Sequence, residues 1–206
     1  MSGVVRGFMH VRGIPATLVL VLVAMTASVA LATVSVGVSV EPGQPTRAVG
    51  APEIFPAFLA MCLPLVCVPR FSGREAVGSL CSRVVHTIFS LGVGFLPSLA
   101  AVAWHLYVDA RYTGIPPLLP LLGTPVVLGL LGVVALYAAG AVWSVLAPGA
   151  LMVTIVLAQH LAPEAAFSQY FSTAKEWVIP WELCLVLLAL ATGLAWRRHS
   201  LPPGAI

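Results

Sequence analysis

The stretch LLPLLGTPVVLGLLGVVALYAAGAVWSVLAPGALMVTIVLAQHL, residues 118–161, decides the fold class because it contains no Asp, Glu, Lys or Arg. It is about twice as long as the roughly 20 residues that one transmembrane helix needs. It therefore predicts two apolar helices. The division is expected near Ala138–Trp143 or, alternatively, at Ala147–Gly149, where Pro148 interrupts the run.

The rest of the chain has the same character. Hydrophobic residues make up 60% of the 206 residues and charged residues only 8%, whereas a soluble domain has about 25% charged residues. Such a chain cannot cover a water-facing surface. Its apolar runs are continuous, not alternating as in barrel strands. We therefore expect an all-α integral membrane protein, in which helices satisfy the backbone hydrogen bonds.

Apolar segments of suitable length recur along the whole chain, which predicts a single transmembrane domain over residues 1–206. The shortest segment contains Pro56 and Pro64, which are expected to kink it. The resulting prediction is six transmembrane helices, at roughly residues 14–40, 54–69, 84–108, 118–138, 141–161 and 178–198.

Charge placement orients these helices. Cytoplasmic loops of membrane proteins carry an excess of Lys and Arg. With six crossings and a cytoplasmic N-terminus, only Arg47, Arg111 and Lys175 lie outside the cell. The predicted location is therefore the cell membrane, with both termini in the cytoplasm. The net charge of +3 follows from this orientation and requires no nucleic-acid partner. The basic residues predicted to be cytoplasmic are Arg6, Arg12, Arg70, Arg74, Arg83, Arg197 and Arg198.

The N-terminus allows one alternative. Arg6 and Arg12, the apolar run and the sequence ALA at residues 30–32 resemble a secretory signal peptide. The apolar run continues to Val40, however, and the apolar region of a signal peptide is typically only 7–15 residues long. Retention of the segment as the first span is the favoured interpretation.

Groups that could perform catalysis are scarce. The chain has no HExxH, no GxSxG and no GxxxxGK[ST] motif, so we expect neither an enzyme nor a cofactor in this chain. Glu182 and His86 are the candidates for an intramembrane polar role, because ionisable groups in spans are costly. The alternatives are that Glu182 reaches the membrane interface and that His86 lies at a cytoplasmic edge. A soft-metal site could also be drawn from His86 with Cys62, Cys67 or Cys81.

The most polar stretch is RFSGREAVGSLCSR, residues 70–83. Ser72 and Glu75 have the spacing of a capping box, which starts a helix. The helix would run from Gly73 into the third span, with an arginine-rich first turn at the cytoplasmic surface. One interpretation of these charges is an anchor that follows the excess of basic residues in cytoplasmic loops.

The residue order supports a second interpretation. Glu75, Gly78, Ser79 and Leu80 match the pattern E-x-x-G-[ST]-L, which resembles the cytoplasmic connection between the second and third spans of ABC-2 type transport permeases. The resemblance implies that this connection forms a short coupling helix that docks into a separate ATPase subunit. The residues to which it assigns ATPase coupling are Arg70, Arg74, Glu75, Gly78, Ser79, Leu80 and Arg83.

The same resemblance implies a function. The chain would be the permease subunit of an ABC transporter, paired with an identical or related second half in the bilayer. Two cytoplasmic ATPase subunits would bind Mg-ATP and drive export of an amphipathic or hydrophobic substrate. A short outer helix would lie between the fifth and sixth spans, where Phe167, Tyr170 and Phe171 fall on one face. The rival function is a non-transporting structural or assembly subunit of a larger membrane complex.

Overall fold

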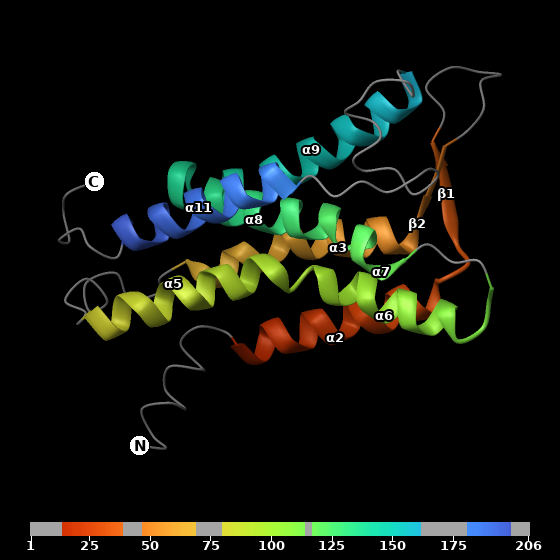
Figure 1. Ribbon diagram of the computed structural model, residues 1–206, viewed down its shortest axis with the longest axis horizontal. Helices are drawn as coiled ribbons and strands as arrows, with labels where there is room; N and C mark the ends of the chain where they lie inside the picture. Colours follow the sequence, from red (N-terminus) through yellow and green to blue (C-terminus); the bar gives the residue numbers. More distant parts are fainter. Residues whose placement is uncertain (1–13, 39–46, 69–79, 114–116, 162–180, 199–206) are drawn as a thin grey trace.

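The protein is an elongated helical bundle with one small β-hairpin at its end (Figure 1). The computed structural model describes residues 14–38, 47–68, 80–113, 117–161 and 181–198. Helices account for 85% of the described residues, in agreement with the predicted helical class. The described elements are α2 (Ile14–Ala30), β1 (Ser35–Val38), β2 (Arg47–Gly50), α3 (Ala51–Cys62), the 3₁₀ helix η1 (Leu63–Cys67), α5 (Leu80–Phe95), α6 (Ser98–Asp109), α7 (Leu118–Leu121), α8 (Gly123–Ala139), α9 (Ala141–Leu161) and α11 (Trp181–Arg198).

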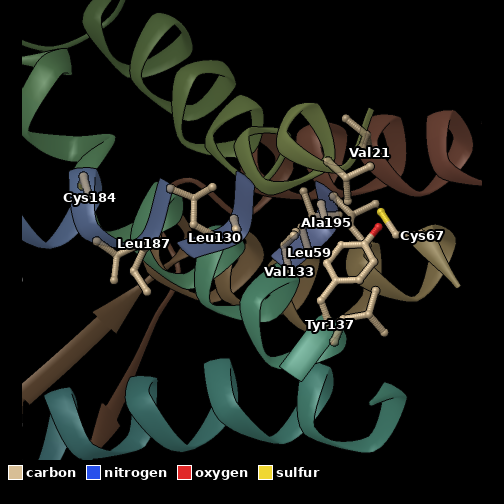
Figure 2. Close-up of a cluster of buried hydrophobic side chains, with 14 of the residues drawn as sticks. Val21, Leu59, Cys67, Leu130, Val133, Tyr137, Cys184, Leu187 and Ala195 are labelled. Atoms are coloured by element: carbon tan, nitrogen blue, oxygen red, sulfur yellow. The ribbon is translucent and has the colours of Figure 1, made fainter. Parts of the chain in front are cut away.

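Helix α8 forms the centre of the bundle. It packs against α9, α11, α5 and α3, while α2 packs against α6 and α3 on the other side of the molecule. Residues all around α8 are buried, including Leu128, Leu130 and Val133. A helix that is apolar on every side needs such a position. Figure 2 shows the resulting core, in which Leu130 and Val133 of α8 lie near Leu59 of α3 and Leu187 of α11.

The ends of the helices gather at two ends of the bundle (Figure 1). Helices α2 and α5 begin toward the same end at which α11 finishes. The hairpin and the C-terminal ends of α6 and α9 lie toward the opposite end. Arg83, in the first turn of α5, and Arg197, in the last turn of α11, therefore belong to one end of the bundle.

The hairpin has a clear origin in the sequence. Residues 34–40 read VSVGVSV, with β-branched residues at every second position, which is the period of a strand. β1 pairs with β2 in antiparallel fashion, with Ser35 opposite Gly50 and Val36 opposite Val49. The chain then enters α3, where the Gly50 N–H donates to the Glu53 carboxylate at 3.3 Å. This contact satisfies one of the free N–H groups at the start of the helix.

The prediction of six membrane-spanning helices is wrong. Among the described residues, α9 alone is long and apolar enough to cross a membrane. The bent pair of residues 83–95 and 98–109 can count as a second span. α2, the segment from α3 through η1, and α8 are apolar but shorter than 18 residues, and a span needs about 20. α11 has 18 residues but carries Glu182, Arg197 and Arg198.

The helices are shorter than the apolar runs because local chemistry ends them. The first run leaves the helix at Ala30 and turns toward the hairpin. The third run breaks between Phe95 and Ser98, at Pro97, with a bend of 41°, as expected where proline removes a backbone donor. The long tract divides at Gly140, whose φ of 98° is a conformation that glycine adopts readily. This break lies inside the first of the two predicted division points.

Two predicted elements fall outside the described residues. Most of the predicted coupling helix lies at residues 69–79, and the predicted outer helix lies within residues 162–180. Both stay predictions.

Candidate functional site

The outward faces of the helices are apolar. Large hydrophobic side chains are exposed along α2, α5, α9 and α11, where a water-soluble bundle would carry charged residues. These surfaces match a lipid or protein environment. Examples with more than half of the side chain exposed are Leu18, Val19, Leu22, Val23, Ile88, Val142, Leu146, Val153, Leu185 and Val186.

A polar stripe faces the interior instead. Arg83, His86, Thr87 and Ser90 follow one another on α5 at the spacing i, i+3, i+4, i+7, which places them on one side of a helix. Arg83 is partly buried, and the other three are buried. α5 therefore presents a polar face to the elements that cover it, which are α8, α11 and η1.

The stripe is tied to the central helix through a tyrosine. The Ser90 hydroxyl donates to the His86 carbonyl oxygen at 2.9 Å. The Ser90 and Tyr137 hydroxyls also form a hydrogen bond with each other, at 2.6 Å. Tyr137 belongs to α8, and its hydroxyl points toward Cys67 of η1 in Figure 2. Buried polar groups are costly unless they are hydrogen-bonded, so this pair fixes how α5 sits on α8.

The backbones of α5 and α8 come very close one turn further along. A Cβ on Gly129 would collide with the Gly94 carbonyl oxygen, and a Cβ on Gly94 would lie 2.9 Å from a terminal carbon of Leu130. Position 129 requires glycine, because the obstacle there is backbone and cannot turn aside, whereas at position 94 the obstacle is the end of a leucine side chain. The two helices are therefore held at a fixed crossing next to the break at Pro97.

An apolar groove of about 300 Å³ opens beside this crossing. Its floor comes from α8, through Gly123, Val126 and Leu130. One wall is the break between α5 and α6, with Phe95 and Ser98. The opposite wall is α11, which contributes Trp181, Cys184, Leu185 and Leu188, and α7 closes the end with Leu119.

The groove offers almost no polar contact to an occupant. The side chains that line it include no Asp, Glu, Lys, Arg or His, and the Ser98 hydroxyl already donates to the Phe95 carbonyl oxygen at 2.6 Å. Trp181, Leu185 and Leu119 at the rim are exposed, while Leu130 on the floor is fully buried. Such a site selects for an apolar chain or ring and cannot orient a polar molecule by hydrogen bonds.

Glu182 is not among the residues that line this groove. It occupies the first turn of α11, next to Trp181 and three residues before Leu185, and it is exposed. A carboxylate in the first turn of a helix is also favoured by the helix dipole. The structure thus places Glu182 on the exposed surface at the start of α11.

The remaining predicted site residues are only partly described. Arg70, Arg74, Glu75, Gly78 and Ser79 lie outside the described residues, and Leu80 is the first residue of α5. Arg83 and His86 share the polar stripe, whereas Glu182 is exposed in the first turn of α11. A metal site was one predicted possibility for His86, but the described part of the chain holds no group of three His, Cys, Asp or Glu side chains placed for a metal.

Comparisons of the chain with protein-family models, with curated proteins and with solved structures find no match. The resemblance to ABC-2 type permeases therefore rests on Glu75, Gly78, Ser79 and Leu80 and not on a relative.

Sequence reasoning missed Ser90, Thr87 and Tyr137 as a polar contact between helices. The signal for the first two was present, because polar residues at positions 83, 86, 87 and 90 have helical spacing. The groove had no such signal. Its walls come from residues 95–98, 119–130 and 181–188, and no local pattern relates these segments.

Proposed function

We propose that this chain is a lipid-embedded subunit of the cell membrane and that it acts as the permease part of an ABC transporter. The observation that carries the lipid setting is the apolar outer face shared by α2, α5, α9 and α11. In lipid the hydrophobic effect does not drive helices together, so such a bundle is held by close packing and by hydrogen bonds between helices. The Gly94–Gly129 crossing and the Ser90–Tyr137 bond are contacts of both kinds.

In the transport role, an ATPase subunit would displace the start of α5. The segment that resembles the ATPase-docking connection leads directly into α5. α5 is tied to α8 by Ser90 and Tyr137 and forms one wall of the groove with Phe95. A displacement at the start of α5 would therefore reach α8 and the groove through packed side chains, which is the physical requirement for coupling between distant sites.

The proposal includes the partners. Separate cytoplasmic ATPase subunits bind Mg-ATP, and a second permease half, identical or related, completes the pathway for an amphipathic or hydrophobic substrate that is exported. Both termini lie in the cytoplasm. The rival function, a structural or assembly subunit, shares the lipid setting but requires no ATPase.

A charge exchange separates the two functions. Arg74→Glu combined with Glu75→Arg keeps the net charge but reverses the local order of charges, and charge complementarity governs partner choice at interfaces. We expect the exchanged variant to insert normally and to lose most of the ATPase that co-purifies with the wild-type chain. The matched control is Arg74→Lys with Glu75→Asp, which keeps both signs and should retain the ATPase.

Two further readouts complete this test. Substrate-stimulated ATP hydrolysis should fall together with co-purification in the exchanged variant. Loss of a helix cap alone costs about 0.5–2 kcal/mol, so the exchanged chain should still reach the membrane in normal amount. If no ATPase accompanies even the wild-type chain, the structural-subunit function replaces the transporter.

A further inference from the structure

A small cavity lies between the first turns of α3 and the corner at which α7 meets α8 (Figure 1). From α3 it is lined by Pro52, Glu53 and Pro56, and Glu53 is the one charged residue of its lining. Its volume is about 10 Å³. One water-sized particle needs roughly 10–15 Å³, so the cavity has room for a single small ion and not for an organic molecule.

Glu53 is an unusual residue for this position, because it is only 8% exposed. Taking a carboxylate out of water is costly unless it is hydrogen-bonded or held by a cation. The Gly50 N–H donates to its Oε2 atom at 3.3 Å. An ionised carboxylate offers about four acceptor positions on its two oxygens, so this cap leaves room for a cation on the same group.

Two prolines add oxygen ligands by removing backbone donors. In a helix each carbonyl oxygen points toward the N–H four residues on, and proline has no N–H. Pro56 thereby removes the helical donor for the Pro52 carbonyl oxygen. α7 passes into α8 through Leu122, whose backbone is also helical, so Pro125 does the same for the Leu121 carbonyl oxygen. Both members of each pair line the cavity, and both carbonyl oxygens therefore belong to its wall.

Thr124 completes the ligand set with a hydroxyl oxygen. The lining then offers one carboxylate, one hydroxyl and two carbonyl groups, and oxygen ligands of this kind suit hard cations. The set carries one negative charge, which a monovalent cation balances. Ca²⁺ takes about six to eight oxygen ligands and Mg²⁺ keeps several of its waters, for which a cavity of this size has no space.

We propose that this cavity binds one Na⁺ ion. Its ligands are the Glu53 carboxylate, the Thr124 hydroxyl and the carbonyl oxygens of Pro52 and Leu121. Carbonyl oxygens released where helices are interrupted suit Na⁺ in membrane proteins. The ion joins α3 to the corner between α7 and α8. The positive ends of the α3 and α8 dipoles oppose a cation, so the dissociation constant should be millimolar. The proposal rests on these oxygens and not on transport or on an ATPase.

Thermal unfolding of the full chain in detergent tests the site, because an ion that binds only the folded state raises its stability. The chloride salts of Na⁺, K⁺ and N-methylglucamine are compared at equal ionic strength and neutral pH. At a Na⁺ concentration about ten times the dissociation constant, we expect a midpoint about 3–6 °C higher than in N-methylglucamine. K⁺ is larger than Na⁺ and should give a smaller rise.

The same substitution at two helix starts provides a matched control. Glu53→Gln keeps an oxygen that can accept from the Gly50 N–H but removes the charge, and it should abolish the rise caused by Na⁺. Glu182→Gln changes an exposed carboxylate in the first turn of α11 and should keep the full rise. Thr124→Val should increase the Na⁺ concentration for a half-maximal rise about 2–10-fold, the effect of one lost neutral contact.

Pro56→Ala tests the carbonyl ligands without a change of charge. It returns an N–H to the helix opposite the Pro52 carbonyl oxygen, so it should also raise the Na⁺ concentration for a half-maximal rise. An unchanged Na⁺ dependence in this variant would remove the Pro52 carbonyl from the site.

Three outcomes would overturn the proposal. The first is an equal midpoint of the wild type in Na⁺ and in N-methylglucamine, or an equal rise in K⁺. The second is a full Na⁺ effect in Glu53→Gln. The third is a midpoint that rises on acidification but not with Na⁺, since Glu53 would then hold a proton in place of the ion. None of these results depends on ATPase co-purification, so this proposal and the proposed function can fail separately.

Discussion

Helices α8 and α9 come from the same apolar tract, but α8 is largely buried and α9 is largely exposed. The tract contains no charged residue, and Gly140 divides it. α8 buries most of its residues, whereas α9 buries only Ser144, Pro148 and Ile155. The two helices are similarly apolar, so hydrophobicity does not decide which becomes the core.

The small residues account for the difference. α8 has Gly129 and Gly132 where neighbouring backbones and prolines approach, and a Cβ at Gly132 would lie 2.8 Å from the Ala60 carbonyl oxygen. α9 instead has large side chains such as Val142 and Leu146 on its outer side. In the proposed lipid setting, helices pack through small residues. The contrast teaches that the positions of glycine, more than the apolar content, identify the central helix.

The largest difference in stability should appear when one glycine is replaced by alanine in α8 and, in a separate variant, one glycine is replaced in α9. Gly129→Ala places a Cβ against the Gly94 carbonyl oxygen, so the backbones must separate, and overpacking of this kind costs about 1–3 kcal/mol or more. Gly149→Ala meets only the end of Met61, at 3.2 Å, and this flexible side chain can move. Alanine also favours a helix by up to about 1 kcal/mol over glycine.

Thermal unfolding of the two variants in the same detergent is the measurement. Gly129→Ala should unfold at a clearly lower temperature than the wild type, and Gly149→Ala at an equal or higher one. Equal destabilisation of both would show that α8 is not the tightly packed centre of the bundle.

The sequence predicted the mostly helical content correctly, but it predicted neither the β-hairpin nor the number of spans, for one physical reason. Apolar content reports the environment of a segment, but it does not report where a helix ends. Helices end here at three local signals, which are the alternation VSVGVSV, Pro97 and Gly140. Each lies inside an apolar run and is therefore easily overlooked. α9 has Pro148 inside the helix and continues, so even proline is not decisive.

The candidate site also has features that the sequence could predict and features that it could not. The polar stripe on α5 is visible in the spacing of His86, Thr87 and Ser90, although its partner Tyr137 lies 47 residues after Ser90. The groove depends on three separate segments and on the bend beside Pro97. Only the packed structure brings these segments together, so the sequence could not predict the groove.

A leucine truncation should have the next largest effect. Leu128 of α8 is fully buried, and Leu146 of α9 is 52% exposed. Leu128→Ala leaves a cavity among Ala57, Ala60 and Leu151 and should cost about 2–5 kcal/mol, the range for truncation of a buried leucine. Leu146→Ala should change the free energy of unfolding by less than about 0.5 kcal/mol.

Unfolding of both leucine variants by a denaturing detergent gives the comparison. The midpoint should shift for Leu128→Ala and stay near the wild-type value for Leu146→Ala. A larger shift for Leu146→Ala would place a protein contact on the outer face of α9, and the apolar face would then be an interface between chains and not a lipid surface.

The smallest effect concerns the hydrogen bond that ties α8 to α5. Tyr137→Phe keeps the ring in place and removes the hydroxyl that is hydrogen-bonded to Ser90, while Ser90 still donates to the His86 carbonyl. The expected loss is about 0.5–1.5 kcal/mol, the net value of one such bond. The control on α9 is Thr154→Ala, because the exposed Thr154 hydroxyl bonds only within its own helix, to the Ala150 carbonyl, and its removal should be nearly neutral.

A double-mutant cycle decides whether Tyr137 acts through Ser90. If the two hydroxyls stabilise the bundle as a pair, Ser90→Ala should cost little once Tyr137 is phenylalanine, since the partner is already gone. The stability of wild type, both single variants and the double variant therefore gives a coupling energy close to the cost of Tyr137→Phe. Additive losses would instead assign the effect of the Tyr137 hydroxyl to a partner other than Ser90, and the Ser90–Tyr137 pair would not be what ties α8 to α5.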